Sequence, residues 1–217
     1  MVIQKLRDPV SGLTHLLGTL LSIPALILLI YYAAKMATVW HVVSFAIFGA
    51  SMILLYTASS LYHLLPISDK GTLVLRKIDH MMIYVLIAGT YTPICLVPLR
   101  GPWGWSLFGS VWGIAITGIF MTAFWIHAPR WLSTLIYTLM GWLVVIAFFP
   151  LAHSMPAGGI AWLVAGGLLY TIGAVIYGTK RPKINFRWFG FHEVFHLFVL
   201  AGSFAHFWLM FRYVLYL

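Results

Sequence analysis

The five residues HEVFH, at positions 192–196, have the residue types and the spacing of a metal site. His192 and His196 are four residues apart, so on a helix their rings lie on one face, about 6 Å apart, where both can bind one tetrahedral zinc ion. The same residues match the H-E-x-x-H signature of zinc proteases, in which the Glu is the general base. The stretch therefore indicates either a protease helix or a metal site of another kind.

Two other short stretches supply polar residues that such a site needs. Ser59 and His63 lie four residues apart in TASSLYH, and Asp79 lies in KIDHMMIY. Three protein ligands with an open fourth position are the coordination of a catalytic zinc, whose bound water is acidic enough to act as hydroxide near neutral pH. His63 is the candidate third ligand, and the Asp79 carboxylate could orient that water or accept its proton.

The elements that carry these residues are predicted to be transmembrane helices. Of 217 residues, 62% are hydrophobic and only 8% are charged, whereas soluble domains have about 25% charged residues. Apolar runs of about 20 residues recur, each long enough to cross a bilayer. The chain is therefore expected to be an all-α integral membrane protein with one domain, 1–217, and seven transmembrane helices. The expected spans are 14–34, 41–65, 79–98, 103–125, 131–152, 159–179 and 192–215.

The distribution of basic residues predicts the orientation of the helices. Of the 13 Lys and Arg residues, all but Lys35, Arg100 and Arg212 fall at the N-terminus or in the loops after the second, fourth and sixth spans. Because cytoplasmic loops are enriched in Lys and Arg, the N-terminus is expected in the cytoplasm and the C-terminus outside. The three polar stretches would then share one depth, near the cytoplasmic face.

The same features limit the partners of the chain. A net charge of +9 would suggest nucleic acid in a soluble protein, but here the charges lie in short loops between apolar runs, so no nucleic-acid partner is expected. The expected partner is membrane lipid. Paired glycines such as Gly158 with Gly159 and Gly166 with Gly167 allow close helix approach and are compatible with a homodimer.

Four stretches of this sequence resemble one membrane-protein family. SSLYHLLP, KIDHMMIYVLIAGTYTP and FHEVFHLFVLAGSFAHF occur in order on the expected spans, and DPVSGLTHLLGTLLS precedes them. Together they resemble the bacterial hemolysin III branch of the progestin and adipoQ receptor family over nearly the whole chain. The resemblance implies seven helices with a cytoplasmic N-terminus, and a multi-pass protein of the bacterial cell membrane.

The resemblance also implies a site and a chemistry. In the family pattern zinc is held by three histidines, here His63, His192 and His196, with Asp79 linked through bound water and Ser59 nearby. Related eukaryotic receptors and alkaline ceramidases imply hydrolysis of a lipid amide, in which zinc polarises the carbonyl. Asp79 and Ser59 are accordingly the candidate catalytic residues.

Three further residues have competing interpretations. Glu193 could be a base, as in proteases, but an acidic residue in the first turn of a helix is also stabilised by the helix dipole, and we favour this second interpretation. His15, which lies with Asp8 at the start of the first span, could have a structural or site-lining role or no role. His206 lies about 15 Å along the helix from His196, too far to bind the same ion, so it either packs with a hydrogen-bond partner, which we favour, or lines an inner cavity.

Four functions remain open. The first is a membrane zinc hydrolase of a lipid amide or related bond, and the second is a nonenzymatic role in membrane homeostasis or receptor signalling with structural zinc. The third is a pore-forming hemolysin, although pores should have polar stripes along whole spans and these polar groups gather at one end. A soluble-type metalloprotease is the weakest, because only about 21 residues follow His196 to supply its third ligand.

Overall fold

The computed structural model describes residues 6–125, 129–184 and 189–217, and the chain folds into helices. Their bounds are α1 Pro9–Met36, α2 Val39–Leu64, α3 Asp69–Leu96, α4 Pro102–Phe124, α5 Arg130–Trp142, η2 Leu143–Ala147, α6 Phe148–Ser154, α7 Ala157–Thr179, α8 Phe191–Arg212 and η3 Val214–Tyr216. The segments α5, η2 and α6 follow one another without a loop and form one rod across Trp131–Ser154. In the described part of the chain there are therefore seven rods of membrane length, which confirms the all-helical fold with seven helices.

Six of these rods are long and apolar enough to cross a membrane. The exception is α3, whose first three turns contain Asp69, Lys70, Arg76, Lys77 and Asp79. The expected third span began at 79, but α3 begins ten residues earlier, at Asp69, with Ser68 as its N-cap accepting a hydrogen bond from the Gly71 amide at 3.3 Å. Hydropathy could not predict this extension because its residues are charged, although Ser68 followed by Asp69 is typical of a helix start.

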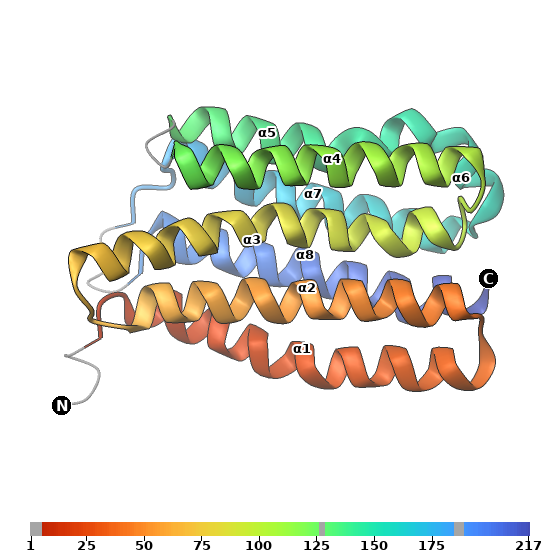
Figure 1. Cartoon of the computed structure of the whole chain (residues 1–217), viewed down its shortest axis with the longest axis horizontal. Helices are drawn as coiled ribbons and strands as arrows, with labels where there is room; N and C mark the ends of the chain where they lie inside the picture. The colour runs from red at the N-terminus through yellow and green to blue at the C-terminus, as the bar shows by residue number, and fades with distance from the viewer. Residues whose placement is uncertain (1–5, 126–128, 185–188) are drawn as a thin grey trace.

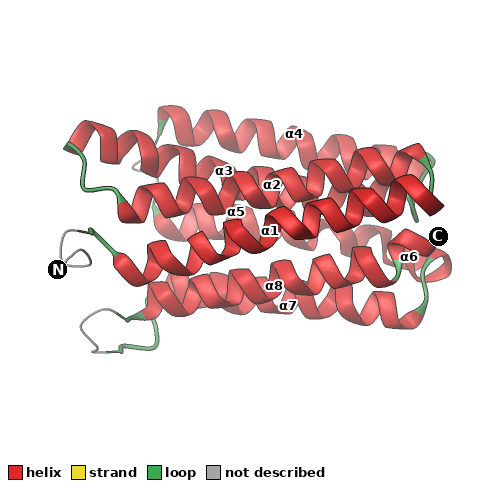
Figure 2. Ribbon diagram, turned by 90° about the horizontal axis from the view of Figure 1, so that it is seen from below, coloured by secondary structure: helices red, strands yellow, loops and turns green. Residues whose placement is uncertain are grey.

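The helices lie along one long axis, and consecutive rods, with α5, η2 and α6 counted as one, run in opposite directions (Figures 1 and 2). The start of α1 and the C-terminus lie at opposite ends of this bundle (Figure 1). The last turn of α2 and the first turns of α3 and α8 share the end at which α1 begins. The prediction that the three polar stretches share one depth is therefore confirmed, while the side of the membrane stays a prediction.

The bundle carries apolar side chains on its outside and polar ones inside. Leu20, Ile27 and Phe124 are 58%, 61% and 86% exposed, whereas Ser59 and His196 are buried. This distribution is favourable only when the surrounding solvent is lipid, which solvates apolar surface. The buried hydroxyls of several helices satisfy their hydrogen-bonding potential within their own helix, as Ser22 does by donating to the Gly18 carbonyl at 2.7 Å.

Candidate metal centre

The first turn of α8 positions two of the predicted ligands. His192 is the second residue of the helix, and His196 follows one turn later. The Glu193 carboxylate accepts hydrogen bonds from the Gly190 amide at 2.7 Å and from the Ser11 hydroxyl of α1. Glu193 therefore caps α8 and joins it to α1, as the first-turn interpretation predicted.

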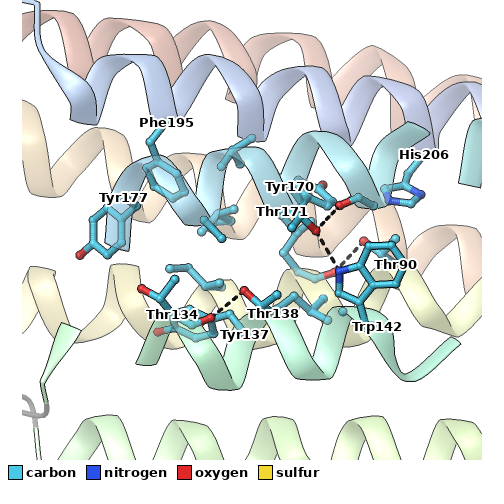
Figure 3. A pocket seen from close by; sticks show the side chains of 18 of the residues that line it. Thr90, Thr134, Tyr137, Thr138, Trp142, Tyr170, Thr171, Tyr177, Phe195 and His206 are labelled. Atoms are coloured by element: carbon cyan, nitrogen blue, oxygen red, sulfur yellow. Dashed lines mark hydrogen bonds between the residues drawn. The ribbon is translucent and has the colours of Figure 1, made fainter. Parts of the chain in front are cut away.

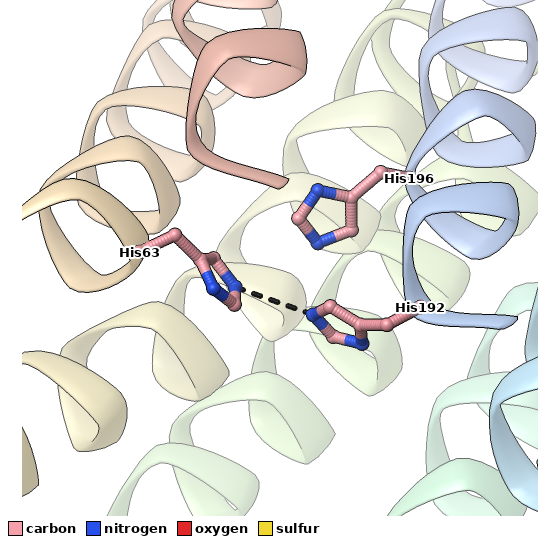
Figure 4. Close-up of side chains that lie close together, drawn as sticks. All are labelled: His63, His192 and His196. Carbon is pink, nitrogen blue, oxygen red and sulfur yellow. Dashed lines mark hydrogen bonds between the residues drawn. The ribbon is translucent and has the colours of Figure 1, made fainter. Parts of the chain in front are cut away.

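The last turn of α2 brings His63 against this pair. The ligand nitrogens of His63, His192 and His196 all lie within 4.8 Å of one another, and the Nε2 atoms of His63 and His192 are 3.2 Å apart (Figure 4). Nitrogens bound to tetrahedral zinc at about 2.0–2.1 Å would lie about 3.3–3.4 Å apart. The three side chains thus fit one metal ion after small movements, and they could hold it from two helices.

In His63 and in His196, a hydrogen bond formed by one ring nitrogen determines that the other nitrogen is available to a metal ion. His63 Nδ1 lies 3.2 Å from an Asp8 carboxylate oxygen, and His196 Nδ1 lies 3.2 Å from the Ser11 carbonyl oxygen. Carboxylate and carbonyl oxygens can only accept, so each Nδ1 carries the hydrogen. In the neutral ring Nε2 then has a free lone pair, which is the form that binds a metal.

The N-terminal segment holds this arrangement in place. The Asp8 amide donates to the His63 carbonyl at 2.9 Å, and the Arg7 guanidinium lies 4.1 Å from the centre of the Tyr62 ring. The hydrogen bond from His63 lowers the pKa of the Asp8 carboxyl, as does Arg7, although partial burial acts in the opposite direction. Asp8 therefore stays ionised and able to accept from His63.

The remaining two candidates lie beside the three histidines. Asp79 is 8% exposed in the third turn of α3, and Ser59 is buried on α2, four residues before His63. Both line the same cavity as His192 and His196. The structure brings together the five residues that the sequence singled out, while the catalytic roles of Asp79 and Ser59 stay predictions.

His15 adds a fourth imidazole to the centre. Its ring stacks on His196 with centroids 3.6 Å apart and an angle of 7° between the planes. The side chain is buried, and neither ring nitrogen has a hydrogen-bond partner among the described residues. Of the two alternatives left open by the sequence, the structure supports the one in which His15 lines the site.

A cavity of about 450 Å³ extends from the histidines into the bundle. One end contains Ser59, Asp79, His192 and His196, and the other contains His206. Phe195 and Tyr177 lie toward the metal end and His206 at the far end (Figure 3). Its size is within the range of small-molecule sites, and its walls are mainly apolar, as a lipid chain requires.

Sequence reasoning gave no role to Ser11, and at the start of the first span, where Asp8 lies, it left open a structural or site-lining role or none. Asp8 contacts His63, 55 positions away, and Ser11 contacts His196, 185 positions away, so sequence spacing gives no signal of either contact.

Two other histidines form hydrogen bonds with backbone carbonyls, His41 with that of Val214 and His153 with that of Phe149. His127 lies outside the described residues.

Known proteins with similar sequences identify the family. A profile of the family described as haemolysin-III related matches residues 3–207. Hemolysin-3 homolog of Bacillus subtilis (strain 168) is 46% identical over 204 residues, which cover 94% of this chain and 92% of that protein. Hemolysin-3 of Bacillus cereus is 43% identical over 205 residues, or 94% and 90% of the two chains.

A more distant relative comes from animals. Monocyte to macrophage differentiation factor of Homo sapiens is 22% identical over 182 residues, which cover 81% of this chain and 72% of that protein. The match to the family profile and the identity to the two Bacillus proteins show that the chain belongs to the haemolysin-III related family. It is a multi-pass membrane protein with a histidine cluster that could hold a metal ion.

Proposed function

We propose that this haemolysin-III related protein is a zinc-dependent hydrolase that cleaves an amide or related acyl bond of a membrane lipid. The observation that carries the proposal is the position of the three-histidine cluster beside Asp79, at one end of a mainly apolar cavity. A zinc ion held there by His63, His192 and His196 would supply a Lewis acid and acidify a water molecule.

The protein side chains would perform the remaining steps. Asp79 would orient the attacking water and accept its proton, and the Ser59 hydroxyl, which lines the same cavity, would donate a hydrogen bond to the carboxylate. The water oxygen would bond to the acyl carbon, the bond from that carbon to nitrogen would break, and the leaving amine would take up the proton. The apolar walls would bind the acyl chain and keep bulk water away, which strengthens electrostatic interactions in the site.

We also propose that the cluster lies near the cytoplasmic face of a bacterial cell membrane. The excess of Lys and Arg in loops at the histidine end supports this orientation. Single cysteines introduced into a Cys95→Ala background at exposed Asp69 and Leu217 can be labelled from either side of intact cells, because Cys95 is the only cysteine of the chain. Labelling of position 69 from outside the cell would contradict the orientation.

Lipid profiling tests the hydrolase directly. Purified protein is incubated with bacterial and synthetic lipids, and free fatty acids and amines are measured by mass spectrometry. We expect at least one lipid amide or ester to be consumed by the wild-type protein and spared by His63→Ala. If zinc is bound but no lipid is consumed in a His63-dependent way, the hydrolase proposal fails and a receptor-like role with structural zinc takes its place.

The relatives named Hemolysin-3 raise a second candidate, a pore. Apart from His206, the histidine and carboxylate side chains that line the cavity gather at one end of it, and its walls are mainly apolar, which favours the hydrolase. Planar bilayers containing purified protein distinguish the two functions. Conductance that persists in His63→Ala would support the pore.

A further inference from the structure

A third histidine of α8 faces the end of the cavity that lies away from the metal ligands. His206 is 5% exposed, and its Nδ1 has no hydrogen-bond partner among the described residues. It lines the cavity together with Tyr170 and Thr90 (Figure 3). A buried polar atom without a partner costs about 1–3 kcal/mol, so the ring of His206 has unused hydrogen-bonding capacity beside the cavity.

The hydroxyl of Tyr170, next to His206, can donate a hydrogen bond into the cavity. Tyr56 donates to Ser203 at 2.6 Å, and the Ser203 and Tyr170 hydroxyls are 2.8 Å apart. Each hydroxyl has one proton, so when Tyr56 donates to Ser203, Ser203 can donate to Tyr170. The proton of Tyr170 is then available to the cavity, next to the His206 ring, whose centroid lies 5.4 Å from that of Tyr170.

Two glycines provide the space for this pair of rings. A Cβ atom on Gly166 would lie 2.6 Å from His206 Nε2, and one on Gly202 would lie 2.7 Å from the Tyr170 ring. Glycine in the interior of a helix costs about 1 kcal/mol relative to alanine. Glycine at these two positions therefore lowers the stability of helices α7 and α8 and makes room for the rings of His206 and Tyr170.

The distance from the metal centre sets the shape of a suitable ligand. His206 lies ten residues beyond His196, which corresponds to about 15 Å along a helix. Between them the cavity is lined mainly by apolar side chains such as Ile83, Ile87 and Val199, together with Tyr137 and Thr138 (Figure 3). A chain with about 1.25 Å of advance per carbon–carbon bond would cover this distance with about twelve carbons.

We propose that His206 and Tyr170 form a second polar subsite, which binds a hydroxyl or carbonyl group carried on the hydrocarbon chain of the lipid. The reacting headgroup would lie at the three histidines, so this part of the inference rests on the proposed function. The subsite would make the protein selective for oxygenated chains over plain saturated chains. The carboxylic acid released by hydrolysis would occupy the same cavity and serves as a probe.

A binding experiment with two fatty acids tests the subsite without requiring turnover. Stearic acid and 12-hydroxystearic acid compete with a fluorescent polyene fatty acid for the full-length protein purified in detergent. The variants are His206→Phe, which keeps a ring without nitrogen, and Tyr170→Phe, which removes one oxygen. Exposed His153→Phe and Tyr31→Phe are the matched controls.

We expect the wild-type protein and both controls to bind 12-hydroxystearic acid about five- to tenfold more tightly than stearic acid, the effect of one hydrogen bond. In His206→Phe and Tyr170→Phe the two acids should bind within about twofold of each other. Tyr170→Phe keeps the test valid if His206→Phe fails to fold. A wild-type protein that binds both acids equally, or neither, would overturn the subsite, as would variants that keep the preference.

The outcome is separable from that of the hydrolase. A wild-type protein that prefers the hydroxylated acid but consumes no lipid would retain the subsite and lose the hydrolase. A protein that consumes lipid in a His63-dependent way but shows no preference would retain the hydrolase and lose the subsite.

Discussion

The two ends of the cavity contain histidines in opposite environments. At one end, His63 and His196 each donate from Nδ1 to a fixed oxygen, that of Asp8 or of the Ser11 backbone. At the other end, Nδ1 of His206 has no partner among the described residues. All three side chains are buried, His63 on α2 and the other two on α8. The difference lies in the partners that the fold places behind each ring.

This difference separates a metal ligand from a ligand-binding group. A ring whose Nδ1 hydrogen is held by an acceptor presents the Nε2 lone pair in one direction, as a metal ion requires. A ring that lines a cavity and has unused hydrogen-bonding capacity can instead bind a polar group of a ligand. The two ends should therefore respond independently to substitution, since residues more than about 10 Å apart without shared partners act additively.

Asp79→Asn is expected to have the largest effect, and only at the metal end. The amide has nearly the shape of the carboxylate but cannot accept a proton, so turnover of the lipid identified by profiling should fall about 10²- to 10⁴-fold. Zinc content, measured by mass spectrometry, should stay at the wild-type level. Exposed Asp69→Asn on the same helix is the control. Unchanged turnover in Asp79→Asn would remove its catalytic role.

Asp8→Asn tests whether the hydrogen bond from His63 to the Asp8 carboxylate contributes to zinc affinity. The amide can present its NH₂ group to Nδ1 and no longer fixes the ring in the metal-binding form, so zinc affinity should fall about 10- to 100-fold. Competition with a fluorescent chelator measures the affinity, again with Asp69→Asn as control. The preference for 12-hydroxystearic acid should not change. If it did, the two ends would be coupled and the comparison would fail.

Gly166→Ala has the smallest expected effect and acts at the far end. The new methyl group would meet the His206 ring, so we expect a loss of about 1–2 kcal/mol in stability. The adjacent Gly167 has open space, and Gly167→Ala should be neutral or slightly stabilising. Thermal unfolding in detergent compares the two variants. Equal melting temperatures would show that His206 does not need the space beside Gly166.

Much of the architecture could be predicted because long apolar runs and the spacing of His192 and His196 are local features of the sequence. The charged start of α3 could not be predicted by hydropathy, since Lys70, Arg76 and Lys77 interrupt the apolar pattern while the helix continues. His206 was expected to have a hydrogen-bond partner for its ring, but its Nδ1 has none among the described residues. That environment depends on Gly166 and Tyr170 of another helix, which no spacing within α8 could indicate.

The metal content of the purified protein tests the central claim most directly. Wild-type protein, His63→Ala, His196→Ala and the exposed control His153→Ala are purified without added metal and analysed by inductively coupled plasma mass spectrometry. The three-histidine centre predicts about one zinc ion per chain in the wild-type protein and the control, and a large loss in the other two variants. Zinc retained at the wild-type level in both His63→Ala and His196→Ala would contradict the metal centre.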